Sequence, residues 1–118
     1  MQGTSLAGRS ILIVEDEPLI SMDIRVAFEN VGAIVITAHT LAAAIGFVEQ
    51  DGLSGAVLDF GLGDGDADAL CGRLKQRAIP FILHSGYARA SLACHGAIVI
   101  PKPAHPEALV GALVTALH

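Results

Sequence analysis

Three short apolar runs of this chain end in residues that can do chemistry: Glu15 and Asp16, Asp59, and Ser85. Continuous apolar runs are typical of buried strands in a parallel sheet, and ligands bind beyond the carboxyl ends of such strands. If the three runs are neighbouring strands, their polar ends meet at one edge of the sheet. Carboxylates packed together repel one another unless a cation lies between them. The pattern therefore predicts a site for a hard cation such as Mg²⁺, suited to phosphoryl transfer.

The apolar residues around these runs recur at spacings that predict alternating strands and helices. Pro18 suits the first turn of a helix, and Thr40 is a typical helix N-cap. The expected strands cover 11–14, 33–38, 55–59, 79–84 and 97–100, and the expected helices cover 18–31, 40–50, 66–74, 88–94 and 106–117. This alternation predicts a doubly wound parallel sheet with right-handed crossovers, in which the fourth helix is shortened.

The bulk composition limits the class of protein. A chain of 118 residues suffices for one domain, and 53% hydrophobic with 16% charged residues excludes a disordered chain. The net charge of −5, without a basic stripe, argues against nucleic-acid binding. No apolar run reaches the roughly 20 residues that span a membrane, so we expect no membrane partner. We expect residues 1–8 to be a loose leader rather than a secretory signal, and 9–118 to be the folded domain.

The cysteines and histidines show no metal-binding pattern. Cys71 and Cys94 form no ligand spacing, and without an export signal we expect two free, buried thiols and a cytoplasmic setting. We expect His84 to be a core residue with satisfied hydrogen bonds. No ligand spacing relates the five histidines, which are His39, His84, His95, His105 and His118.

The acidic pair, Asp59, Ser85 and the Lys102–Pro103 pair after the last strand together resemble the receiver domain of response regulators. Each motif alone is weak, but the set keeps the order and spacing of a receiver from about Arg9 to Leu117. The resemblance implies a flavodoxin-like fold with strand order 2-1-3-4-5. It also implies a phosphoacceptor of a two-component or phosphorelay system, which takes a phosphoryl group from a histidine kinase or histidine phosphotransfer protein. Such a domain signals by protein–protein contact and is not a metabolic enzyme.

The same resemblance assigns roles to individual residues. The Mg²⁺ ligands would be Glu15, Asp16, Asp59 and the backbone carbonyl of Gly61. Asp59 would accept the phosphoryl group, Ser85 would hydrogen-bond a phosphoryl oxygen, and Lys102 would pair with it. The Lys102–Pro103 bond is expected to be cis. Elementary physics supports these roles, because a transferring phosphoryl group spreads negative charge over its oxygens and needs neutralisation and positioning.

The chain departs from the usual receiver pattern at the switch position. Most receivers carry an aromatic residue three positions before the lysine, where this chain has Val99. We expect Tyr87, two residues past Ser85, to serve as the switch and partner contact instead. The segment 80–87 resembles the Phe-Ala-Thr-Gly-hydrophobic-Tyr motif of alphaproteobacterial single-domain regulators, although here the tyrosine follows the glycine directly.

Three alternatives stay open. Glu15 and Asp16 suit the N-terminus of a helix, where acidic residues are favourable. Val99 and the short fourth helix would fit a degenerate receiver that acts as a phosphorylation-independent interaction module. A Toprim-like Mg²⁺-dependent nuclease would use Glu15 with Asp64 and Asp66, but those two aspartates lie in a glycine-rich turn rather than at the end of a strand.

The last helix is apolar beyond one stripe. Leu109 and Leu113 belong to the face expected to meet the core, and Val110 and Val114 add apolar residues on its flank. This excess favours a partner surface or a homodimer through the helix, while the alternative is that neighbouring loops cover the flank.

Overall fold

The computed structural model of the protein describes residues 6–59, 68–85 and 96–117. They form a parallel sheet of five strands in the order β2-β1-β3-β4-β5. This topology confirms the predicted flavodoxin-like fold; the helix expected at 88–94 lies outside the described residues. The elements in chain order are β1 (Ser10–Val14), α1 (Pro18–Asn30), β2 (Ile34–Ala38), α2 (Leu41–Val48), β3 (Leu53–Asp59), α3 (Asp68–Gln76), β4 (Phe81–Ser85), β5 (Ile98–Pro101) and α4 (Pro106–Leu117).

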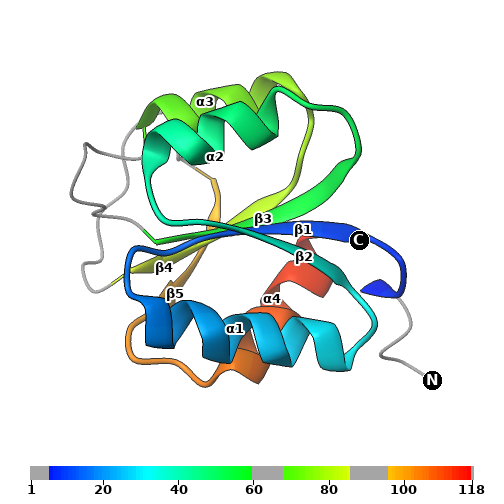
Figure 1. Ribbon diagram of the computed structural model, residues 1–118, viewed down its shortest axis with the longest axis vertical. Coiled ribbons are helices and arrows are strands. Elements are labelled where there is room, and N and C mark those ends of the chain that lie inside the picture. Colours follow the sequence, from blue (N-terminus) through cyan, green and yellow to red (C-terminus); the bar gives the residue numbers. More distant parts are fainter. Residues whose placement is uncertain (1–5, 60–67, 86–95, 118) are drawn as a thin grey trace.

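Helices cover both faces of the sheet. Figure 1 shows α2 and α3 on one side of the strands and α1 and α4 on the other. Leu12 and Leu58 pack in the apolar cluster under α2 and α3, whereas Ile13 and Val57 pack in the cluster against α1 and α4. Because successive side chains of a strand point to opposite faces, this alternation decides which side each strand-end residue takes.

The turn after α1 is packed against the N-terminal segment. Gly32 has a φ of +89°, which favours glycine, and a Cβ there would lie 3.2 Å from the Cα of Ala7. The Gly8 N–H donates to the Gly32 carbonyl at 2.9 Å, and Leu6 is fully buried in the cluster on the α1 and α4 side. The last three residues of the predicted leader therefore pack onto the domain.

One expected feature of helices α2 and α3 is confirmed and another is wrong. The Thr40 hydroxyl caps α2 by accepting a hydrogen bond from the Ala43 N–H at 3.1 Å, as predicted. Cys71 is buried on α3 but is disulfide-bonded, so the prediction that it is a free thiol is wrong. The other cysteine, Cys94, lies outside the described residues.

Helix α4 packs on the sheet through Leu109 and Leu113, which are fully buried. Val110 and Val114 are half-buried and also contact the cluster on this side, so neighbouring residues cover part of the apolar flank. A homodimer through α4 stays a prediction. Within residues 6–59, 68–85 and 96–117, no helix has the length and apolar character needed to cross a membrane.

The contact between β3 and α4 predicts opposite effects for two glycine substitutions. Gly55 is buried in β3, and a Cβ there would lie 3.2 Å from the Leu113 Cδ2 atom and 3.4 Å from the Pro80 carbonyl oxygen. Leu113 is fully buried, so we expect the added methyl group to overpack this contact and Gly55→Ala to lower the free energy of unfolding by about 1–3 kcal/mol. Gly111, on the exposed side of α4, has no atom within 4 Å of such a Cβ.

For that reason Gly111→Ala is the matched control, and we expect it to raise the stability by about 0.5–1 kcal/mol through helix propensity. Urea denaturation of the two variants beside the unmodified protein measures both effects. A Gly55→Ala variant as stable as the parent would contradict the described contact of α4 with the sheet.

Candidate functional site

The register of the sheet brings three titratable residues into one row. Val14 pairs with Leu58 between β1 and β3, which places Glu15, the next residue, opposite Asp59. Asp59 pairs directly with His84 of β4. Because side chains alternate along a strand, all three lie on the face of the sheet that α1 and α4 cover. The carboxyl ends of β1, β3 and β4 thus assemble a polar row above a closed apolar core.

The predicted acidic cluster forms at this edge. One oxygen from each of Glu15, Asp16 and Asp59 lies within 4.8 Å of the others. Glu15 and Asp59 are buried, with 1% and 5% of their surface exposed, whereas Asp16 is exposed. The Glu15 Oε1 atom is buried without a hydrogen-bond partner among the described residues. Converging carboxylate oxygens with an unsatisfied buried acceptor fit a hard divalent cation such as Mg²⁺.

Burial makes Glu15 hold a proton in the absence of a cation. The pKa of Glu15 is raised to about 8, first by burial and then by its hydrogen bond with Asp59 and the charge of that residue. The Glu17 backbone N–H, which donates to Glu15 Oε2 at 3.2 Å, and the charge of Lys102 both oppose this rise. At neutral pH Glu15 therefore keeps its proton.

Lys102 reaches Asp59 from the segment after β5. Its Nζ atom donates to Asp59 Oδ1 at 2.6 Å, and its side chain is 28% exposed. The Lys102–Pro103 peptide is cis, as predicted. Lys102 thus contacts Asp59 from the β5 side of β3, whereas Glu15 lies on its β1 side.

The remaining predicted residues are placed less completely. Ser85 is the last residue of β4 and pairs in register with Pro101, at the same edge as Asp59. Val99 lies in β5 and is 37% exposed, with no aromatic ring at that position. Gly61 and Tyr87 lie outside the described residues, so their assigned roles stay predictions.

The alternative in which Glu15 and Asp16 only cap α1 does not account for the cluster. The N-cap of α1 is Glu17, whose own side chain makes no cap hydrogen bond. Glu15 does accept from the Glu17 N–H, but Glu15 and Asp16 each also place a carboxylate oxygen within 4.8 Å of an Asp59 oxygen.

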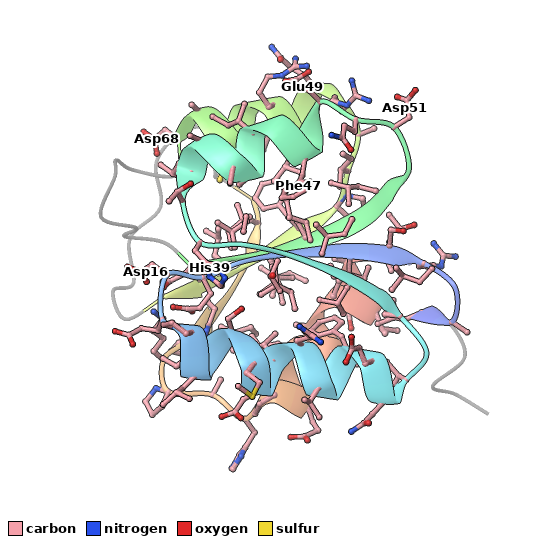
Figure 2. All side chains as sticks on the ribbon, viewed as in Figure 1. Asp16, His39, Phe47, Glu49, Asp51 and Asp68 are labelled. Carbon is pink, nitrogen blue, oxygen red and sulfur yellow. The ribbon has the colours of Figure 1, made fainter. Side chains whose placement is uncertain are left out.

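Two histidines lie at this edge in environments that were not predicted from the sequence. His39 follows β2, and its Nδ1 atom lies 2.9 Å from the Glu15 backbone oxygen, so the ring anchors the segment that carries the acids. Figure 2 shows Asp16 and His39 at the same end of the sheet, near the start of α1. His84 is buried as predicted, but the expectation that its hydrogen bonds are satisfied is wrong, because neither buried ring nitrogen has a partner in the part of the chain that the structure describes. The sequence offered one signal for each: His39 directly follows β2, and His84 directly precedes Ser85.

A parallel sheet with helices on both faces defines a doubly wound α/β protein, and the acidic cluster lies at the carboxyl ends of its strands. The sequence pattern described as the response regulator receiver domain matches residues 11–114, so the chain belongs to that family. Members of this family generally bind Mg²⁺ at an acidic pocket and interact with histidine kinases, phosphotransfer proteins or downstream proteins, and this chain has an acidic cluster of Glu15, Asp16 and Asp59.

Individual proteins agree with this assignment. The chain is 34% identical over 114 residues to the phyllosphere-induced regulator PhyR of Methylorubrum extorquens, covering 91% of this chain and 43% of that protein. It is therefore less than half as long as this curated relative. A receiver domain protein of Methanospirillum hungatei has 28% identity and a TM-score of 0.83, with 94% of each chain covered. PhyR of Brucella abortus has 27% identity and a TM-score of 0.78, covering 95% of this chain and 49% of that one.

The raised pKa of Glu15 predicts that Mg²⁺ binding depends on pH. Because the cation needs the ionised carboxylate, a proton must leave Glu15 at any pH below about 8. We expect the Mg²⁺ affinity to rise by up to about tenfold per pH unit between pH 6 and 8 and to level off above that. Isothermal titration calorimetry at several pH values measures this dependence.

The matched variants are Glu15→Gln and Glu29→Gln. Glutamine at position 15 carries no competing proton, so the affinity of that variant should be lower at pH 9 and nearly flat with pH. Glu29 is exposed and pairs with Arg25, so its variant should behave as the unmodified protein does. Equal Mg²⁺ affinity of the unmodified protein at pH 6 and pH 9 would contradict the raised pKa of Glu15.

Proposed function

We propose that Asp59 accepts a phosphoryl group from a phosphohistidine, with Glu15, Asp16 and Asp59 holding Mg²⁺. The single observation that carries this proposal is the contact of Lys102 Nζ with Asp59 Oδ1 at 2.6 Å inside the acidic cluster. A buried carboxylate that belongs to an acidic cluster and contacts an ammonium group is suited to act as a nucleophile, because the negative charge of the transferred group can be neutralised there.

Each described side chain has a part in this chemistry. Glu15, Asp16 and Asp59 would bind the metal, which when present neutralises charge on the phosphoryl oxygens. Lys102 supplies a point charge to the transferred group. The segment that ends β4 brings Ser85 to the same edge, where its hydroxyl would hydrogen-bond a phosphoryl oxygen, and the Gly61 carbonyl would complete the metal ligands.

The transfer balances without any further reagent. An Asp59 carboxylate oxygen attacks the phosphorus atom, the P–N bond to the donor imidazole breaks, and the imidazole leaves with the electron pair and later takes a proton. The product is an acyl phosphate, which water can hydrolyse by attack at phosphorus to restore the carboxylate. In both the transfer to Asp59 and the hydrolysis, Lys102 faces the negative charge of the phosphoryl group, so this one residue assists phosphorylation and dephosphorylation.

The partners follow from this chemistry. The donor is a histidine kinase or a histidine phosphotransfer protein, and the output is contact with a downstream protein, with Tyr87 and Val99 as candidate contact residues. We propose residues 9–118 as the receiver and the cytoplasm as its setting. The two PhyR proteins named above are more than twice as long as the part that this chain matches, so what the whole protein does also belongs to this proposal. Similarity to the alphaproteobacterial single-domain subgroup stays a prediction of the segment 80–87.

The test is the intact mass of the protein after incubation with acetyl phosphate. We expect one added phosphoryl group in the presence of Mg²⁺, at least tenfold less adduct with a chelator, and none in Asp59→Asn. Asp51→Asn is the matched control, because Asp51 is an exposed aspartate that pairs with Arg77 far from the cluster.

Failure of all conditions to give an adduct, with folded protein and no complex with fluoroberyllate, would contradict the proposal. That result would favour the degenerate receiver, an interaction module that works without phosphorylation. An adduct of equal amount in Asp59→Asn would place the acceptor elsewhere.

A further inference from the structure

His84 is the buried group of this edge that the proposed chemistry does not use. It lies in β4 beside Asp59 and is 5% exposed, and neither Nδ1 nor Nε2 has a hydrogen-bond partner among the described residues. Most buried polar side chains in proteins are hydrogen-bonded, so an imidazole with two unused nitrogens needs an explanation. An aliphatic side chain at this position would carry no such penalty.

A cavity lies between His84 and the segment that carries Lys102. It has a volume of about 190 Å³ and opens between α1 and the residues that follow β5. Its lining is mostly apolar, and includes Ile20, Ile24, Pro103 and Pro106, with His84 and Lys102 among its polar members. His84 and Lys102 therefore border the same cavity, together with Asp23 of α1.

The two groups are complementary as donor and acceptor. Burial lowers the pKa of His84, and the charge of Lys102 lowers it further, while Asp59 opposes this change. A neutral imidazole offers one nitrogen lone pair, and a lysine ammonium has three N–H groups. One of those N–H groups donates to Asp59 Oδ1, which leaves others for a second acceptor.

We propose that His84 is a positioning residue for Lys102: its ring accepts a hydrogen bond from the Lys102 ammonium when that group turns from the Asp59 carboxylate to a phosphoryl group on it. The inference rests on the proposed function of Asp59. The cavity beside the lysine gives the side chain room for this change, and the buried ring limits the directions in which the ammonium can settle. Restricting a charged group to a productive geometry is a recognised source of rate enhancement.

The experiment compares His84→Leu and His84→Gln with the unmodified protein and with His105→Gln. For each, the rate of phosphorylation by acetyl phosphate, the rate of phosphoryl loss and the Mg²⁺ affinity are measured. We expect His84→Leu to slow both rates by about three- to tenfold and to leave the Mg²⁺ affinity unchanged. The glutamine side-chain oxygen can accept from lysine, so His84→Gln should recover most of both rates. His105 is exposed, and its variant should behave as the parent does.

Nuclear magnetic resonance of the unmodified protein tests the contact itself and needs no variant to fold. In protein labelled with ¹⁵N, we expect the chemical shift of one His84 ring nitrogen to change when Mg²⁺ and fluoroberyllate bind, because that nitrogen then accepts a hydrogen bond. Unchanged ring nitrogens together with parental rates in His84→Leu would overturn the inference, and slow rates in both His84 variants would overturn the acceptor role. Absence of any adduct in the unmodified protein would instead contradict the function of Asp59.

Discussion

Glu15 follows β1, Asp59 ends the neighbouring strand β3, and their carboxyl groups repel each other when both are ionised. The parallel register fixes the two residues next to each other, because Val14 and Leu58, which directly precede them, are paired and buried. Two observed features relieve the repulsion: burial keeps a proton on Glu15, and Lys102 contacts Asp59. A cation bound between the carboxylates, as proposed, would relieve it as well. The proposed chemistry of the site consists of replacing the Glu15 proton by a bound cation and moving Lys102 from Asp59 to a phosphoryl group.

The rest of the fold keeps this conflict in place. Apolar residues on both faces of β1, β3 and β4 pack against helices, so the strands cannot slip without exposing core side chains. The α1 and α4 side carries the polar row, and Lys102 arrives just before α4 begins. The acids thus lie at the edge of a rigid sheet, while the lysine comes from a connecting segment with a cavity beside it.

The apolar runs were sufficient to predict the strands, their order through the family resemblance, and the convergence of Glu15, Asp16 and Asp59. This part was predictable because burial on two faces leaves a continuous apolar signal that stops where chemistry begins. Hydrogen bonds across the sheet leave no such signal. The contact of His39 with the Glu15 carbonyl and the unpartnered ring of His84 depend on register and packing. The disulfide of Cys71 likewise depends on a distance in space that sequence spacing does not reveal.

The most direct test of the account is to locate the phosphoryl group chemically. Borohydride reduces an acyl phosphate of aspartate to homoserine, so peptide mass spectrometry after phosphorylation and reduction identifies the acceptor. The account predicts homoserine at position 59, formed only when Mg²⁺ was present during phosphorylation. Homoserine at position 16 instead, or a phosphopeptide that resists reduction, would contradict the assignment of Asp59 as the nucleophile of the acidic cluster.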